Sequence, residues 1–549
     1  MTLVEEPLVR LRRMSESFGN EPETRVIEAR RLRLIFCLSC GVIYFAAGMW
    51  LISKGDFLIG DAAYRTANAR TILFSRDPHL AAIGMVWMPL STLSTLPFTA
   101  LFEPVGFAWA AGAAMSAAYG AGFAWAMTRM ASHLCPSSAA AQVVVAVTLL
   151  NPVTVFWMGS GMMEAPSLFF LAWAILSWLR WTDTRDVRYL SLLGIAIGLG
   201  FLTRYEQLFV AVVFVLLVGW FSNSGSRRNA MILVAAPTIC VGLVWLGVNL
   251  VIKGDPFAFI PEVDPAQALL PVEMQLVGTR TLELLPALWY AGRRILHFAP
   301  AVLCTPIIAV VEHRTSRWRP AIFGASLAAL SSPIFVGLLT MSEGKTTGNP
   351  RYFLNAIVIG PLFALAALSG RIRGARPWSI VLCIAVLAGS VTAARMELSV
   401  FYTGIEHEEV AISRLTGLAP KPLAGQAADE LPFDGLAGPW KDAAREIDAA
   451  IGSGHSIATD SSSAFLVLLF TDRPDQFVIP EDRDFEQLLS LNGARFDYVF
   501  VRRGQVTSQT GINSKLVSVV DTQQTTFHFE QVGQYPGVGE LWKRVDDGV

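Results

Sequence analysis

The run LIFCLSCGVIYFAAGMWLIS, residues Leu34–Ser53, is closely followed by GDAAYR, residues Gly60–Arg65. Twenty consecutive, mostly apolar residues are the length that crosses a lipid bilayer as a helix. The carboxylate of Asp61 follows this run at a short distance, where a membrane surface is expected. The two stretches together predict a membrane-embedded protein with an acidic group at one surface.

The composition extends this interpretation to the whole chain. Of the 549 residues, 53% are hydrophobic and only 16% are charged, and the mean hydropathy is +0.47. Soluble domains carry about 25% charged residues, so apolar runs of membrane length explain the deficit. The net charge of −1 gives no indication of a nucleic-acid partner, and no zinc spacing, phosphate loop or dinucleotide fingerprint is present. The Cys37–Cys40 pair lies inside the first apolar run, which favours a packing role over redox or metal chemistry.

The distribution of arginines predicts the topology. Residues 1–33 contain seven arginines and are predicted to be cytoplasmic, because positive charge before a membrane helix holds that end inside. We predict about 11 transmembrane helices, at roughly 34–53, 107–129, 139–157, 166–180, 188–203, 206–221, 230–252, 295–311, 321–341, 352–370 and 377–394. The arginine clusters near residues 129, 185, 227, 317 and 373 then all fall on the cytoplasmic side.

One segment decides the orientation of everything after it. Residues 86–103 are also apolar, but counting them as a span places every later arginine cluster outside. We therefore predict an amphipathic helix on the outer surface, within a long first external loop at 54–106. The membrane domain is expected to cover 34–394, and the odd number of spans places the rest of the chain outside the cytoplasm.

The C-terminal region is polar and is predicted to be a small α/β domain. Residues 395–440 are interpreted as an external linker rich in Gly and Pro, followed by the domain at 441–549. Helical patterns near 443–451 and 463–470 alternate with strand-like segments at 455–459, 477–479 and 496–501. Residues 527–529 and 540–542 are typical of a closing hairpin.

With this topology, ionisable side chains gather at the outer ends of the helices. They are Asp61 in the first loop, Glu164 before the fourth span, Arg204 and Glu206 between the fifth and sixth spans, and Arg351 after the loop 342–350. A charge at a helix end can extend to water. Four sets on one face indicate a function, because charge at membrane depth is costly unless it is paired or used.

These features resemble the GT-C superfamily of integral-membrane glycosyltransferases. The resemblance rests on an acidic residue soon after the first span, a long first external loop with the Pro89-Leu90 helix, and the pattern Thr203-Arg204-Tyr205-Glu206. Its members include protein mannosyltransferases, arabinofuranosyltransferases and the aminoarabinose transferase of lipid A. The resemblance implies a polyprenyl-phosphate-linked sugar as donor and a role in building glycans of the cell envelope at a plasma or inner membrane.

The resemblance also implies roles for individual residues. Asp61 is the candidate general base that takes the proton of the acceptor hydroxyl, in an inverting transfer. Arg204 and Arg351, with Lys345 as a third, are candidate partners of the leaving phosphate. The remaining candidates for contact with sugar or acceptor are Glu164, Tyr205, Glu206, Tyr352, Tyr64, Asp77 and His79. For Asp77 a turn before Pro78 is the competing interpretation, and for the aromatic residues it is anchoring at the membrane interface.

Two departures from the family patterns bear on the mechanism. Asp61 is followed by Ala62, where protein mannosyltransferases carry a second acidic residue, and Glu164 is not part of an Asp-x-Asp motif. Both weaken the case for a divalent metal and for a protein acceptor. The acceptor therefore stays open among glycan, lipid and protein, and metal dependence stays open as well.

Two other classes of function are compatible with the composition. A transporter or flippase of a lipid-linked or small solute is the main alternative, although such proteins place their binding groups near the midplane of repeated halves, and this chain shows no evident repeat. A sensor with an external ligand-binding domain needs far fewer spans. The sequence favours the membrane transferase.

Overall fold

The structure is a computed structural model that describes most of the chain. The described residues are 5–85, 87–136, 138–259, nine residues from 285 to 302, 321–340, 350–369, 437–491, 493–503, 511–522 and 526–546. The predicted linker, most of the predicted span 295–311, all of the span 377–394 and Lys345 lie outside them.

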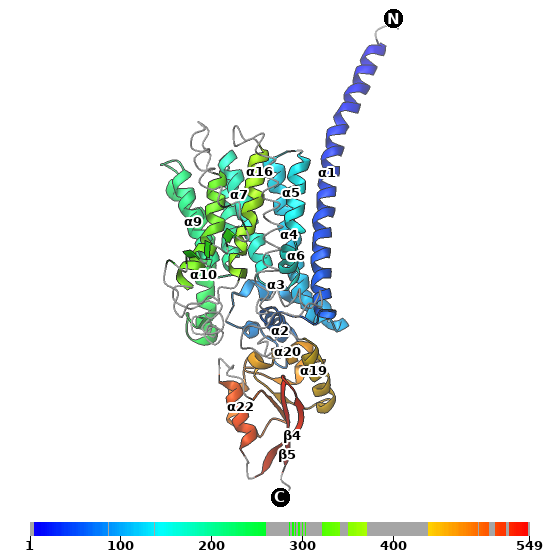
Figure 1. Ribbon diagram of the computed structural model, residues 1–549, viewed down its shortest axis with the longest axis vertical. Helices are drawn as coiled ribbons and strands as arrows, with labels where there is room; N and C mark the ends of the chain where they lie inside the picture. Colours follow the sequence, from blue (N-terminus) through cyan, green and yellow to red (C-terminus); the bar gives the residue numbers. More distant parts are fainter. Residues whose placement is uncertain are drawn as a thin grey trace.

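The membrane half is a bundle of helices that stands on the C-terminal domain (Figure 1). Its helices are α1 (Glu5–Ser53), α4 (Ala111–Leu134), α5 (Ala139–Leu149), α6 (Pro152–Gly159), α7 (Glu164–Thr184), α8 (Val187–Phe201), α9 (Gln207–Phe221), α10 (Arg227–Lys253), α15 (Ala321–Phe335) and α16 (Ile359–Leu368). A π-helical turn, Val336–Thr340, extends α15, and a 3₁₀ helix, Pro350–Val358, precedes α16.

The predicted span 139–157 is two helices rather than one. The helices α5 and α6 meet at an angle of 57°. Pro152 has no backbone N–H to donate, and its ring disfavours a helical conformation for Asn151. The Asn151 side chain accepts a hydrogen bond from the backbone N of Val153 at 3.0 Å and so begins the second helix. The break therefore has a local cause in the Asn151-Pro152 pair.

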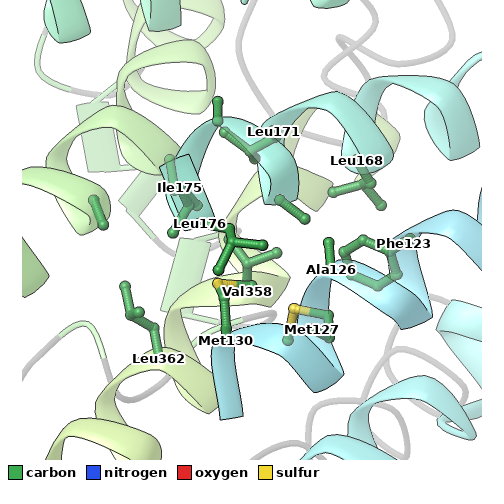
Figure 2. Packing of buried hydrophobic residues seen from close by; sticks show 14 of the residues in the cluster. Phe123, Ala126, Met127, Met130, Leu168, Leu171, Ile175, Leu176, Val358 and Leu362 are labelled. Carbon is green, nitrogen blue, oxygen red and sulfur yellow. The ribbon is translucent and has the colours of Figure 1, made fainter. Parts of the chain in front are cut away.

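Close packing holds the bundle together. A Cβ atom on Gly48 of α1 would lie 2.1 Å from the backbone oxygen of Gly159 in α6, so only glycine permits this approach. Cys37 and Cys40 are buried in α1 as free thiols, in agreement with the predicted packing role. Figure 2 shows Phe123 and Met127 of α4 packed with Leu171 of α7 and with Val358, which joins three parts of the chain into one apolar core.

Several helices have the length and composition of membrane spans. In the described part of the chain these are Arg30–Ser53, Arg227–Lys253 and Ala321–Leu338, with the bent pair α5–α6 as a fourth if it counts as one span. The helices α8 and α9 and the segment Arg351–Ala366 are apolar but shorter. The total of about 11 spans remains a prediction.

The segment predicted as the first external loop, 54–106, is largely helical. It contains α2 (Gly60–Phe74) and α3 (Pro89–Phe102), and α3 confirms the helix expected at 86–103. The side of α3 that faces the protein is polar, with Ser91, Thr92, Thr95 and Thr99 all buried, whereas Leu93 and Leu101 are exposed. Figure 1 shows α3 and α2 lying between the bundle and the C-terminal domain.

In the residues that the structure describes, the C-terminal domain is a five-stranded mixed sheet with four α-helices, which confirms the predicted α/β class. Its helices are α19 (Ala437–Ile451), α20 (Ser461–Phe470), α21 (Phe485–Ser490) and α22 (Ile512–Asp521). The strands β1 (Ile457–Ala458), β2 (Phe477–Val478), β3 (Tyr498–Val501), β4 (Phe527–Tyr535) and β5 (Gly539–Asp546) lie in the order β2-β1-β3-β5-β4. Strands β2, β1 and β3 are parallel, and β4 and β5 form the expected antiparallel hairpin.

Candidate active site

Asp61 lies in the first turn of α2 and forms an ion pair across the molecule. Its Oδ2 accepts a hydrogen bond from Nη1 of Arg351 at 2.7 Å. Arg351 belongs to the 3₁₀ helix before α16, 290 positions later in the sequence. The helix α2 begins at Gly60 directly after the buried residues Phe57, Leu58 and Ile59, and these fix the place where the chain turns from the membrane half into α2.

A second charged group surrounds Arg204, in the turn between α8 and α9. Arg204 donates hydrogen bonds to Glu164, at the start of α7, and to Glu206. Arg204 is 7% exposed and Glu164 only 2%. A buried charge needs a partner of opposite sign, and here each buried charge has one. The helices α7, α8 and α9 run in alternating directions, so these groups lie at the end of the bundle next to α2.

Tyr352 joins the two charged groups. The guanidinium carbon of Arg204 lies 5.1 Å from the centre of the Tyr352 ring, and that of Arg351 lies 5.3 Å from it. Both distances are within the range of cation–π attraction. A small pocket opens here, lined by Glu164, Ser167, Leu168, Arg204, Glu206, Ser332, Arg351, Tyr352, Leu354 and Asn355. The sequence-derived candidates from three distant segments therefore line one pocket.

Arg65 is a further charged residue of this site, and the sequence alone predicts no role for it. It follows Asp61 by one helical turn and is 2% exposed. Its Nη2 contacts the sulfur of Met162 at 3.2 Å, and its guanidinium lies 5.4 Å from the centre of the Trp87 ring. Its Nε and Nη1 atoms are buried and have no hydrogen-bond partner among the described residues. Burial lowers the pKa of Arg65 to about 10, although Asp61 and Glu164 partly offset this effect.

The other candidates lie away from the pocket. The carboxylate of Asp77 accepts a hydrogen bond from the backbone N of Arg483 at 3.0 Å, and His79 bonds to the backbone oxygen of Asp77. Tyr64 packs edge-on against Phe465 of α20, and the Tyr205 ring stacks on Phe259 at 5.2 Å. Asp77 and Tyr64 thus contact the C-terminal domain. Across the described residues, no three His, Cys, Asp or Glu side chains are grouped as a metal site requires.

The site can bind an anion next to a carboxylate. The site contains three arginines and three carboxylates: Arg65, Arg204, Arg351, Asp61, Glu164 and Glu206. Arg204 and Arg351 are already paired with carboxylates. Arg65 has buried N–H groups to spare, and hydrogen bonds from such groups to phosphate are strong because the charge assists them. The site thus places the carboxylate of Asp61 next to arginines that can bind a phosphate group.

Comparison with known proteins gives a consistent result. Residues 89–249 match the sequence model of a family described as dolichyl-phosphate-mannose-protein mannosyltransferase. No curated protein sequence matches the chain significantly. The fold is similar to two crystal structures of ArnT from Cupriavidus metallidurans. The form bound to undecaprenyl phosphate superposes with a TM-score of 0.53 at 13% identity, covering 94% of this chain and 98% of ArnT. The apo form gives a TM-score of 0.50 at 13% identity, with 95% and 98% covered.

Proposed function

We propose that this chain transfers a sugar from a polyprenyl-phosphate donor to an acceptor hydroxyl. The basis is its GT-C fold, which is the fold of a superfamily of integral-membrane glycosyltransferases. The observation that carries this proposal is the ion pair between Asp61 and Arg351. Arg351 lines a pocket together with Arg204, and the buried Arg65 lies one helical turn after Asp61. The family match and the likeness to ArnT support a lipid-linked donor.

The donor phosphate binds to the arginines. Arg204 and Arg351 each have a carboxylate partner, whereas Arg65 has two buried nitrogen atoms without one. Leaving a buried charge unpaired is strongly unfavourable, and a phosphate oxygen is a suitable acceptor for the Arg65 guanidinium. The ArnT structure contains undecaprenyl phosphate, which is the same chemical class of ligand. We assign Arg65 as the main phosphate contact and the other two arginines as neighbours that add positive charge.

Asp61 acts as the general base of a single displacement. The acceptor hydroxyl gives its proton to the Asp61 carboxylate while its oxygen forms a bond to the anomeric carbon of the sugar. The bond between that carbon and the phosphate oxygen breaks, and its electron pair leaves with the lipid phosphate. The arginines compensate the negative charge that develops on this leaving group. Attack opposite the leaving group inverts the configuration of the anomeric carbon.

The remaining candidates bind or shape the substrates. Tyr352 and the pair Glu164–Arg204 form the wall of the pocket that receives the sugar, with Glu206 beside them. We propose that the cytoplasm holds the N-terminus and that the pocket and the C-terminal domain lie on the outer side of a plasma or inner membrane. The acceptor is a glycan, lipid or protein of that outer side.

The test is transfer by the purified protein in lipid vesicles. Radiolabelled polyprenyl-phosphate hexoses and pentoses are supplied with a membrane extract as acceptor, and the labelled product is analysed for a new glycosidic bond. We expect Asp61→Asn to reduce turnover by about 10²–10⁴-fold, the usual contribution of a general base, at unchanged protein level. Full activity of this variant would remove Asp61 from the mechanism. Movement of labelled donor across the bilayer without a new bond would instead favour a flippase.

Asp56→Asn is a matched control for this experiment. Asp56 lies five positions before Asp61, and its backbone oxygen accepts a hydrogen bond from Ala437 at 3.1 Å. Its φ of 51° is in the left-handed region, which Asn adopts about as readily as Asp. The control variant removes a neighbouring negative charge without touching the pocket, so we expect it to retain turnover. Comparing cell-envelope glycans with and without the protein then identifies the sugar.

A further inference from the structure

We propose that Arg70 is a positioning residue through which the C-terminal domain holds α2, and with it Asp61 and Arg65, in the geometry for transfer. This inference rests on the proposed function and adds to it a role for the C-terminal domain. In this role the domain supports the helix that carries the proposed base and phosphate contact.

Arg70 joins three parts of the structure with one side chain. Its Nε and Nη2 donate to the two carboxylate oxygens of Glu103 at 2.7 and 2.5 Å. Its Nη1 donates to the backbone oxygens of Leu468, Leu469 and Thr471 at 2.9, 3.3 and 2.6 Å. Arg70 is only 5% exposed, so water does not compete for these bonds. The planar guanidinium suits this set because it donates in several fixed directions at once.

The carbonyl groups of Leu468 and Leu469 belong to the last turn of α20, and Thr471 is its C-cap residue. The last carbonyls of a helix have no partner within the helix, and this end carries a partial negative charge. Arg70 satisfies three of them from an element about 400 positions away in the sequence. On the domain side, Asp448 of α19 accepts hydrogen bonds from the Thr471 hydroxyl at 2.5 Å and from the backbone N of Asp472 at 2.7 Å. The end of α20 is therefore fixed from both sides.

Apolar packing makes the same connection along the rest of α2. Ala63 and Ala67 are buried in the apolar core of the C-terminal domain, together with Leu466 and Val467 of α20. Tyr64 contacts Phe465 with ring centres 5.6 Å apart. Small side chains on α2 let the two helices approach closely. Figure 1 shows α20 directly beneath α2, on the side away from the bundle.

Arg70 acts through the helix rather than on the substrate. It follows Asp61 by nine positions, which at 100° per residue places the two side chains on opposite faces of α2 and roughly 13 Å apart along its axis. One face of α2 thus carries Asp61 to Arg351 at the edge of the pocket, while the other face is held by the domain. A displacement of reacting groups by 1 Å can reduce the rate of a reaction by about 10²-fold, so a loosened α2 should lower turnover.

The experiment compares Arg70→Gln with wild type in the full-length protein. We expect kcat to fall by about 10–100-fold while the KM for the polyprenyl-phosphate donor rises by a smaller factor, because the Arg65 contact to phosphate is loosened but not removed and Arg204 and Arg351 stay in place. Hydrogen exchange should rise in peptides covering 60–74 and 461–470, and remain unchanged in α7. Arg503→Gln is the matched control: Arg503 forms ion pairs with Asp521 and Glu540 on the domain surface, and its loss should leave kcat and exchange in α2 unchanged.

A double variant separates positioning from folding. Arg70→Gln leaves the Glu103 carboxylate without its partner, and this alone can destabilise the protein. Arg70→Gln with Glu103→Gln removes that charge, so we expect the protein level to recover while kcat stays low. Recovery of kcat, or wild-type kcat and exchange in Arg70→Gln, would overturn the inference. If wild-type protein transfers no sugar, the proposed function fails, and the exchange data still decide whether Arg70 holds α2.

Discussion

Replacing Arg65 with methionine should make the resting protein more stable and the enzyme inactive. Methionine keeps the unbranched apolar stem of arginine beside Met162 and Trp87 and carries no charge. The variant removes the two buried nitrogen atoms that have no partner among the described residues. The two effects have opposite signs because a group suited to a ligand phosphate is unfavourable when that ligand is absent.

The magnitude follows from the pKa of Arg65. Burial lowers this pKa from 12.5 to about 10, and each unit corresponds to about 1.4 kcal/mol, so the charged form is disfavoured by roughly 3 kcal/mol. Loss of the contact with the Trp87 ring returns about 1 kcal/mol. We therefore expect Arg65→Met to stabilise the ligand-free protein by about 1–3 kcal/mol. This gain is fully present below pH 10 and should fall progressively as the pH rises above 10, because wild-type Arg65 then loses its proton in the folded protein before it does so in the unfolded chain.

The assay is thermal unfolding of the purified protein in detergent, with and without polyprenyl phosphate. The variant should unfold at a temperature about 1–3 °C above wild type in the absence of lipid. Saturating lipid at 100 times its Kd stabilises wild type by about 2.7 kcal/mol. The variant should bind the lipid roughly 10–100-fold more weakly, as expected for loss of a charge-assisted hydrogen bond. Its response to the same concentration should then be much smaller.

Two results would refute this reasoning. A variant that unfolds at a lower temperature than wild type would mean that Arg65 is paired in the resting protein. A variant that binds polyprenyl phosphate as tightly as wild type would remove Arg65 from the phosphate site. Arg502→Met is the matched control, since Arg502 is also buried but donates a hydrogen bond to the backbone oxygen of Ser463 at 3.1 Å. Its replacement should lower the unfolding temperature.

Three further predictions concern the second charged group, the C-terminal domain and the topology. Arg204→Ala should impair donor use and destabilise the protein by about 3–5 kcal/mol, because Glu164 is left buried and unpaired. Adding Glu164→Gln should restore thermal stability but not turnover. Unchanged turnover in either variant would contradict the role of Arg204 in donor binding. Burial raises the pKa of Asp448, so the native state favours its protonated form, and wild type should gain stability relative to Asp448→Asn as the pH falls from 7 to 4. The exposed Asp442→Asn serves as control in these melts, and equal slopes for both variants would refute the shift. In a cysteine-free background, Ser514→Cys should react with a membrane-impermeant thiol reagent in intact cells and Thr184→Cys only after lysis; the reverse pattern would invert the topology.

Much of the fold could be predicted because its causes are local. The length of each apolar run depends only on neighbouring residues, so the helices of the bundle could be expected from it, whereas the side of the membrane on which each arginine cluster lies stays a prediction. The strands near 457, 477 and 498 and the final hairpin follow from short runs of β-branched and aromatic residues. The short helices α21 and α22 were not predicted. The break at Pro152 had a local signal in Asn151-Pro152, but the apolar run on both sides concealed it.

The site was predictable as a set of residues but not as an arrangement. Asp61, Glu164, Arg204 and Arg351 could be selected because charge at the end of an apolar run is costly. Their pairing could not, since Asp61 meets Arg351 across 290 positions and the partners of Arg204 depend on how α7 packs beside α8. Asp77 and His79 looked like further members of the site, yet they lie at the contact with the C-terminal domain.

The stretch Gly60–Arg65 shows most clearly what the sequence determines and what only the tertiary structure determines. The sequence alone determined that a carboxylate follows the first membrane helix, because both features are written in adjacent residues. Only the tertiary structure decided that these residues begin a buried helix, and hence that Arg65 lies one turn from Asp61 on the same face. One face of α2 carries Asp61 to Arg351, and on the other face Arg70 is bound to the C-terminal domain. This arrangement depends on contacts between distant segments. Such contacts arise from packing, and no local pattern encodes them.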